Sequence, residues 1–182
     1  MEKGKKNEEL FCSMPVPQAI LTLAVPTVVS QIITIIYNMA DTFFIGQLGD
    51  PKQVAAATLA MPLFMFMTAL ANLFGVGGAS LISRFLGGGE RTKASRCGAF
   101  CIWTAAGISV LYGVLVLAGR PVLLPLLGAN AETCDMAASY LFWTIGLGAL
   151  PTVMNPALAH LIRAEGYSRQ ASFGVAFGGI LN

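Results

Sequence analysis

Charged residues are scarce in this chain. Asp, Glu, Lys and Arg together make up 11% of its 182 residues, whereas an average soluble domain carries about 25%. Hydrophobic residues make up 55%, and the mean hydropathy is +0.71. So few polar side chains cannot cover the surface of a water-soluble globule. The net charge of +2 is too small to indicate a nucleic-acid partner. We therefore expect an integral membrane protein that binds no nucleic acid.

The sequence also offers little to a metal ion or to a catalytic centre. Its four cysteines form no CxxC pair, and Cys97 and Cys101, one helical turn apart, are more typical of small core residues than of metal ligands. His160 is the single histidine and has no ligand partner one turn away. The segment GVGGAS has Ser80 where a dinucleotide fingerprint needs its third glycine. We expect no enzyme activity, no metal site and no cofactor.

What the sequence has in abundance is long apolar runs. A bilayer core needs about 20 mostly apolar residues per helix. Four complete runs and the beginning of a fifth lie at 18–46, 53–83, 97–118, 136–162 and 172–182. No β-type alternation is visible, so the predicted fold class is all-α integral membrane. The fifth run stops short of a span, which predicts a cytoplasmic N-terminal segment at 1–17 and an incomplete, truncated transmembrane lobe at 18–182.

Basic residues are distributed unevenly between the two sides of these predicted spans. With the N-terminus in the cytoplasm, the outer loops hold Lys52 and Arg120, and the inner segments hold the other nine of the 11 basic residues. Those nine are Lys3, Lys5, Lys6, Arg84, Arg91, Lys93, Arg96, Arg163 and Arg169. The positive-inside rule thus predicts a multi-pass protein of the cell (plasma) membrane with a cytoplasmic N-terminus.

The first apolar run carries a polar stripe. At 100° per residue, six polar residues fall within an arc of about 120°. They are Ser30, Gln31, Thr34, Tyr37, Asn38 and Asp41. Unsatisfied polar groups in hydrocarbon cost several kcal/mol each. The stripe is therefore predicted to face other helices or a watery cavity.

Asp41 is the one acid of the nine that lies inside a predicted span. A charged Asp at a helix centre costs roughly 2.5–3.5 kcal/mol, so such a residue normally marks an ion or substrate path. A carboxylate near amide and hydroxyl oxygens suits either a proton or a sodium ion. The alternative is a structural acid that reaches the headgroups, because Asp41 precedes Gly46 by about 7–8 Å along the helix.

Further polar residues and prolines interrupt the other apolar runs. The intramembrane polar candidates are Asn72, Tyr140, Asn155 and Asn182. Each is a possible partner of Asp41 or a residue that holds helices together by hydrogen bonds. The prolines that remove helical hydrogen bonds are Pro26, Pro62, Pro151 and Pro156. Such positions predict either helix bends that change during transport or permanent kinks.

These segments carry a resemblance to a known family. LAVPTVVSQIITIIYNMADTFFIGQLG resembles the first helix of the multidrug and toxic compound extrusion (MATE) family of cation-coupled antiporters. Supporting segments are VAAATLAMPLF, GVGGASLISRFLGGGERTKA, NPALAHLIRAEGYSRQAS and the terminal GGILN. The resemblance covers essentially residues 15–182, in order, and is strongest to bacterial members.

The resemblance implies twelve helices in two six-helix lobes around a central cavity. Members export amphipathic, often cationic compounds in exchange for H⁺ or Na⁺. This chain resembles the first four and a half helices, so alone it is expected to be inactive. Its expected partners are the lipid bilayer, small-molecule drugs or toxic compounds, and the missing C-terminal lobe of the same protein.

The resemblance also implies roles for individual residues. Asp41 stands where many prokaryotic members have the coupling acid of the first helix. Tyr140 and Asn155 match a tyrosine and an asparagine of the fourth helix, and Asn182 matches an asparagine of the fifth. Pro26 matches a proline where the first helix bends. Four other residues of the stripe are candidates for lining the substrate cavity: Gln31, Thr34, Tyr37 and Asn38.

Three other functions stay open at the level of the sequence. A lipid or lipid-linked sugar flippase of the same broad superfamily would favour Lys or Arg inside the cavity, and none lies within a predicted run. An intramembrane enzyme would need a deep catalytic set, for which the chain offers Asp41 and His160. In a non-transporting structural membrane subunit, the substitution Asp41→Asn would be silent.

Overall fold

The computed structural model describes residues 15–47, 51–130 and 133–181, and within these the side chains of a few helical residues, Asp41 among them, lie outside the description. The described chain is helical throughout, without a strand, which confirms the predicted all-α class. Its helices are α2 (Val16–Gln47), α3 (Pro51–Gly87), α4 (Arg91–Leu126), α5 (Cys134–Leu141), the π-helix η1 (Phe142–Leu147), α6 (Ala149–Ala164) and α7 (Ser168–Leu181).

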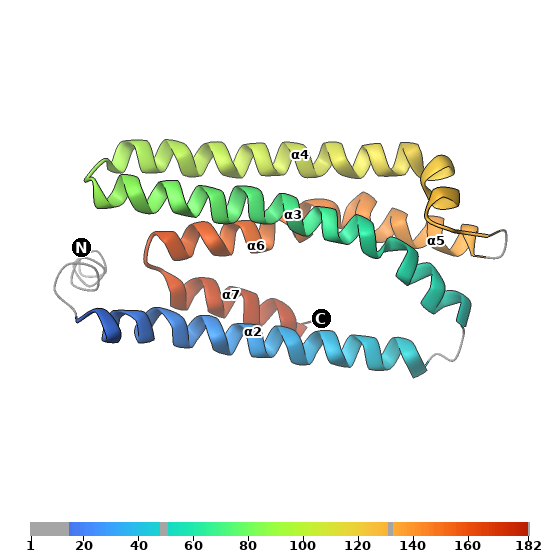
Figure 1. Cartoon of the computed structure of the whole chain (residues 1–182), viewed down its shortest axis with the longest axis horizontal. Helices are drawn as coiled ribbons and strands as arrows, with labels where there is room; N and C mark the ends of the chain where they lie inside the picture. Colours follow the sequence, from blue (N-terminus) through green and yellow to red (C-terminus); the bar gives the residue numbers. More distant parts are fainter. Residues whose placement is uncertain (1–14, 48–50, 131–132, 182) are drawn as a thin grey trace.

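The helices are long rods that lie side by side, and successive segments of the chain run in opposite directions (Figure 1). The α3–α4 turn, the α6–α7 turn and the start of α2 share one end of the molecule. The end of α2, the start of α3 and the α4–α5 turn share the other end. Three helices are long and apolar enough to cross a membrane, and a fourth span arises if the bent pair of Cys134–Leu147 and Ala149–Ala164 counts as one.

The helices extend beyond the apolar runs that predicted them. The segments that were expected to be long connections are partly helical, since α3 begins at Pro51, α4 at Arg91 and α7 at Ser168. Arg120 was assigned to an outer loop, but it lies inside α4. Arg84 and Arg163 likewise lie inside α3 and α6, so basic residues are present within the helices. The physical reason is that helix continues through the headgroup region, where hydropathy no longer marks it.

Three of the helices end in the same way. The N–H groups of Glu90, Ala129 and Tyr167 donate to carbonyls five residues earlier, with N···O distances of 2.8, 2.9 and 3.2 Å. The preceding residue is a glycine with positive φ in each case, for example Gly128 at 95°. This Schellman geometry needs a left-handed residue after the helix, which glycine adopts without steric cost. The turns are therefore short and fix which helices are neighbours.

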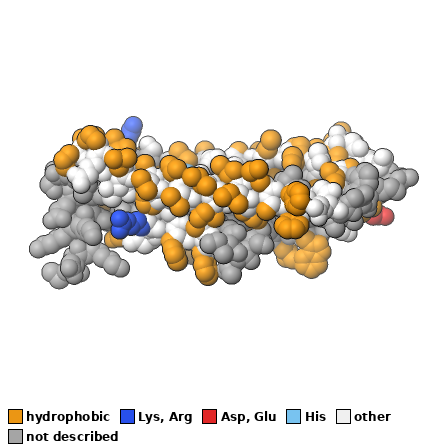
Figure 2. All heavy atoms as spheres, turned by 90° about the horizontal axis from the view of Figure 1, so that it is seen from below, with side chains coloured by type: hydrophobic (Ala, Val, Ile, Leu, Met, Phe, Trp, Pro, Cys, Tyr) orange, Lys and Arg blue, Asp and Glu red, His pale blue; other side chains and the backbone are white. Residues whose placement is uncertain are grey.

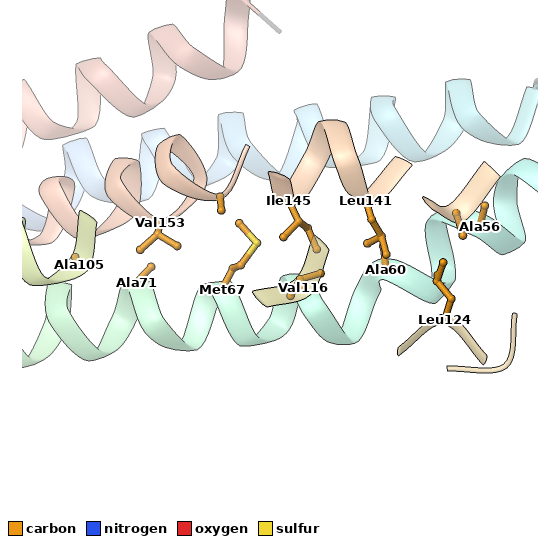
Figure 3. Packing of buried hydrophobic residues seen from close by; sticks show 12 residues of the cluster. Ala56, Ala60, Met67, Ala71, Ala105, Val116, Leu124, Leu141, Ile145 and Val153 are labelled. Carbon is orange, nitrogen blue, oxygen red and sulfur yellow. The ribbon is translucent and has the colours of Figure 1, made fainter. Parts of the chain in front are cut away.

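The core lies between α3, α4 and the α5–η1–α6 segment. Figure 3 shows Met67 of α3 pointing at Ile145 of η1, with Val116 of α4 beside them. Further along, Val153 of α6 faces Ala71 of α3. Alanines fill much of the remaining core, which allows the helices to approach closely. A second cluster of Ile82, Cys101 and Leu161 with Ala94 closes the end near the α3–α4 turn.

Glycines bring the backbones of the bundle together at two crossings. A Cβ at Gly78 of α3 would lie 2.7 Å from the Cys101 Sγ atom and 2.9 Å from Leu161. A Cβ at Gly113 of α4 would lie 3.1 Å from the Ile145 carbonyl oxygen. Real Cβ atoms do not approach other atoms as closely as 2.7 Å, so only a glycine fits at position 78 without a shift of its neighbours.

The outer surface is apolar. Figure 2 shows hydrophobic side chains along the middle of one face, with Lys and Arg near the end where α2 begins and acidic atoms at the opposite end. Exposed large residues include Phe43, Phe100, Trp103, Leu126 and Phe173. A contiguous apolar surface of this extent is unstable in water but matches lipid chains.

Candidate functional site

The polar stripe of α2 lies along its contact with α7. α2 packs chiefly on α7, and α7 in turn packs on α6, so α7 separates α2 from the bundle (Figure 1). Ser30 is 1% exposed, and Thr34 and Tyr37 are half-buried. Gln31 and Asn38 are exposed on the flank of the same stripe. One edge of the stripe is thus covered and the other edge is open.

The hydroxyl groups of α2 are satisfied within their own helix. Ser30 Oγ donates to the Thr27 carbonyl at 2.8 Å, and Thr34 Oγ1 donates to the Ser30 carbonyl at 2.9 Å. Thr27 does the same to the Leu23 carbonyl at 3.0 Å. Such back-bonding lets a hydroxyl lie in an apolar environment without an interhelical partner. The Gln31 carboxamide and the Tyr37 phenol are further polar groups of the same stripe.

Asp41 belongs to α2, six residues before its end, but its side chain lies outside the described residues. By helical spacing, position 41 shares the side of α2 that carries Ser30 and Thr34. Asn182 lies outside the described residues altogether. The roles assigned to these two residues stay predictions.

Asn155 of α6 lies against α7. Its Nδ2 atom is 3.8 Å from the place that a Cβ at Gly178 would occupy. The fold thus brings Asn155 of α6 against Gly178 of α7. The sequence alone does not predict that Asn155 and Gly178 lie close together. Their proximity follows from the short α6–α7 turn, which folds α7 back onto α6.

Tyr140 of α5 has a different environment. It is half-buried and meets the ring of Phe64 of α3 edge-to-face, with a centroid distance of 6.4 Å. Its backbone carbonyl accepts a hydrogen bond from Thr144 Oγ1 at 2.5 Å. Tyr140 thus packs in the α3–α5 interface, and its predicted coupling role stays a prediction. Pro26 lies inside α2, where it removes one helical hydrogen bond.

The bend in the fourth span lies about one helical turn before Pro151. Pro151 and Pro156 are the expected break points, and both lie within α6. The 45° bend occurs at Gly148, directly after the π-helical turn η1. Pro151 has no N–H to donate to the Leu147 carbonyl, and its ring crowds that carbonyl, so the bend lies where Pro151 disrupts the helix. Pro156 lies further along α6, where the helix continues without a break.

Titratable and metal-ligating groups are sparse in the described part of the chain. No group of three or more His, Cys, Asp or Glu side chains is close enough there to hold a metal ion. His160 lies on α6 against α3, where a Cβ at Gly75 would be 3.1 Å from its ring. Its position is explained by packing of α6 on α3.

The chain is similar in sequence to a known family of membrane proteins. The model of the MatE family matches residues 26–182 of this chain. The chain belongs to the MatE family. It is a multi-pass membrane protein, as its exposed apolar helices require.

Individual relatives agree with the MatE assignment. The multidrug export protein MepA of Staphylococcus saprophyticus is 31% identical over 138 residues, which cover 75% of this chain and 31% of that protein. MepA of Staphylococcus haemolyticus is 29% identical over the same length. The chain thus spans about a third of the length of the curated relatives it matches.

Solved structures share the MatE arrangement of helices. A crystal structure of MATE in complex with MaD3S superposes with a TM-score of 0.88 at 26% identity, over 97% of this chain and 39% of that one. The outward-facing conformation of a multidrug resistance MATE family transporter of the MOP superfamily gives a TM-score of 0.86 at 26% identity, over 97% of this chain and 38% of that one. The overall arrangement of the described helices is therefore a fold known in MATE transporters.

Proposed function

We propose that this chain forms part of a multidrug efflux antiporter that exports amphipathic, often cationic compounds in exchange for H⁺ or Na⁺. The support is the MatE family match, together with relatives whose names describe multidrug export. The observation that carries the proposal within this chain is the polar stripe of α2, which runs along α7 through a segment otherwise made of apolar residues.

Asp41 has the central role in this proposal. A carboxylate at this depth is costly when charged, so a proton or a sodium ion that neutralises it is bound favourably. Neutralisation removes the need for polar surroundings, and the packing of α2 on α7 then changes. Drug and cation compete because each favours a different packing of the two helices.

The open edge of the stripe supplies the recognition groups. Gln31 and Asn38 are exposed, and Thr34 and Tyr37 are half-buried beside them. Carboxamides and a phenol present both donors and acceptors without a fixed charge. Such a surface accommodates cations of varied shape by dipoles and an aromatic face. Broad substrate range fits this chemistry better than a set of fixed ion pairs would.

The orientation in the membrane is part of the proposal. Arg84, Arg91, Arg163 and Arg169 lie near the two turns that share the end of the molecule where α2 begins. The positive-inside rule assigns that end, and with it the N-terminus, to the cytoplasm.

Efflux by a chimera tests the proposal. Residues 15–182 would replace the matching part of the Staphylococcus saprophyticus protein, and a fluorescent cationic dye would be added to the medium of everted vesicles, whose outer face is the cytoplasmic one. Dye movement driven by a proton gradient or by a sodium gradient is expected, and the effective gradient identifies the coupling ion. Normal membrane insertion with no dye movement under either gradient would contradict the proposal.

A lipid exporter is the second candidate, and one observation favours it. Arg163 Nε is buried in α6 and has no hydrogen-bond partner among the described residues. A half-buried arginine whose Nε donor is unused is suited to a phosphate oxygen. The same vesicles therefore receive a fluorescent phospholipid in a parallel assay. Movement of the phospholipid without movement of the dye would favour this alternative.

A further inference from the structure

An open pocket of about 540 Å³ lies between α4 and the α5–η1 segment, at the opposite end of the molecule from the α3–α4 turn. Three residues of α4 line one wall: Arg120, Pro121 and Leu124. The other wall includes Asp135, Ser139, Phe142 and Trp143. None of these residues belongs to the α2 stripe, and the proposed transport function uses none of them.

The two walls place the pocket at a membrane–water interface. Between Arg96 and Arg120, α4 has 23 uncharged residues, which span about 35 Å. The hydrocarbon core of a bilayer is about 30 Å thick. The two arginines therefore bracket one bilayer core, and Arg120 lies at the headgroup level.

The lining changes in character with depth. Asp135 lies in the first turn of α5, at the end of the molecule, and Ser139 and Trp143 follow at intervals of one helical turn on the same side. The α5–η1 segment runs from this end of the molecule back along the bundle (Figure 1), so Phe142 and Trp143 lie deeper than Asp135. On this wall an acid is thus outermost, a hydroxyl comes next and two aromatic rings lie deepest, and Arg120 lies on the facing wall of α4.

Arg120 and Asp135 are both exposed and form no ion pair with each other in the described chain. The Ser139 hydroxyl likewise has no hydrogen bond to a described residue. An acid and a cation that line one pocket without neutralising each other suit a ligand that carries both charges. The aromatic floor requires that this ligand continue into an apolar tail.

We infer that this pocket binds a phospholipid with a zwitterionic, primary-amine headgroup, of the phosphatidylethanolamine type. Its ammonium group is the outermost part of the lipid and meets Asp135. Its phosphate lies one step deeper, where Arg120 and Ser139 donate to it. Its acyl chains run over Phe142 and Trp143. A primary ammonium donates hydrogen bonds to the carboxylate, which the quaternary ammonium of phosphatidylcholine cannot do.

The two tryptophans of the chain make the inference measurable. Trp143 lines the pocket, whereas Trp103 is 78% exposed on α4, nearer the other end of the helix. In the Trp103→Phe variant of the full 182-residue chain, Trp143 alone reports on the pocket. In Trp143→Phe, Trp103 alone reports on ordinary surrounding lipid. Each variant is reconstituted into bilayers in which one lipid carries brominated acyl chains that quench tryptophan.

Brominated phosphatidylethanolamine is expected to bind beside Trp143 about threefold more tightly than brominated phosphatidylcholine, the size of one exposed charge contact. Beside Trp103, the two brominated lipids are expected to bind equally tightly. In the Asp135→Asn variant, the preference for brominated phosphatidylethanolamine beside Trp143 should also disappear. Arg120→Gln should weaken both lipids, since both have a phosphate, and Arg120→Lys should preserve the preference. Both positions are exposed, so these changes should leave the helical content unaltered.

Three results would overturn the inference. Equal quenching of Trp143 by both lipids would mean that the pocket holds unselected surrounding lipid. A preference for brominated phosphatidylglycerol would show that Arg120 acts alone on anionic lipid. Relief of quenching by tetraphenylphosphonium in preference to added phosphatidylethanolamine would assign the pocket to cationic amphiphiles. Dye efflux by the chimera is measured independently of this quenching, so the inference and the proposed transport function fail separately.

Discussion

The α3–α4–α6 bundle and the α2–α7 pair are built on different principles. In the bundle, 22% of the most apolar stretch of α3 and 28% of that of α4 is buried, against 6% in α2. Met67, Ile145 and Val116 interlock at the centre of the bundle, and glycines bring its backbones together. In α2, the residue buried most completely is the small, polar Ser30.

Within this chain, the bundle is held by many buried apolar contacts, whereas α2 contacts chiefly α7. The polar stripe lies on this loosely packed helix, whereas the close-packed bundle has an apolar centre. We therefore expect substitutions in the bundle to affect stability, and substitutions in the α2–α7 pair to affect helix positions and transport.

Met67→Ala is expected to have the largest effect on stability. Met67 is 0% exposed, and removing a fully buried side chain of this size costs about 2–5 kcal/mol. Met65→Ala is the matched control, since Met65 lies on the same helix but is 71% exposed. Reversible unfolding in bicelles measures both. Equal losses in the two variants would contradict the position of the core.

Gly78→Val tests the closest approach of the bundle helices. The new side chain would overlap Cys101 and Leu161, so we expect a loss of about 1–3 kcal/mol from overpacking. Gly77→Val is the control on the same turn of α3, where no atom lies within 4 Å of the new Cβ. Both variants share the glycine-to-valine change in a helix. Equal losses in the free energy of unfolding of the two variants would show that α3 and α4 do not approach most closely at Gly78.

Tyr112→Phe removes a single hydrogen bond between helices. Tyr112 Oη donates to the Leu63 carbonyl of α3 at 3.0 Å. Interhelical hydrogen bonds in membranes average about 0.6 kcal/mol, and we expect a loss of that size in the same unfolding assay. Thr68→Val is the comparison, because the Thr68 hydroxyl bonds within its own helix to the Phe64 carbonyl. A larger loss for Thr68→Val would reverse the expected order.

Ser30→Leu should have the smallest effect on the bundle. Ser30 faces the covered edge of the stripe, and a leucine there would push α2 from α7. Bundle stability should change by less than about 0.5 kcal/mol, because the sites are far apart. Spin labels at the exposed positions Val29 and Phe173, in a background without native cysteines, should report an increased distance. An unchanged distance with a destabilised bundle would show that α2 belongs to the core.

Much of the fold was predictable because lipid imposes a simple rule. Apolar runs of sufficient length are helices, and each predicted run lies within or along an observed helix. The helix ends were not predictable, since Pro51, Arg91 and Ser168 begin helices in polar segments where hydropathy carries no signal. Of the two prolines of the fourth span, Pro151 indicates the bend at Gly148, because a proline disrupts the helix about one turn before itself, whereas Pro156 fits within α6.

The candidate site was predictable as a stripe but not as an arrangement in space. Periodicity grouped Ser30, Thr34 and Tyr37 on one side of α2, and they do lie toward the covered edge. Periodicity could not tell that α7 is the covering helix, since that depends on contacts between segments far apart in the sequence. The proximity of Asn155 to Gly178 arises in the same way.

The most direct test of the central claim is cation-driven dye efflux by the chimera with Asp41→Asn, compared with Asp135→Asn. Both changes remove one carboxylate, but Asp135 lies on α5, outside the α2–α7 pair. We predict that Asp41→Asn abolishes gradient-driven efflux with normal insertion, and that Asp135→Asn retains it. Unchanged efflux in Asp41→Asn would show that this acid is structural and that the stripe of α2 does not couple cation to drug.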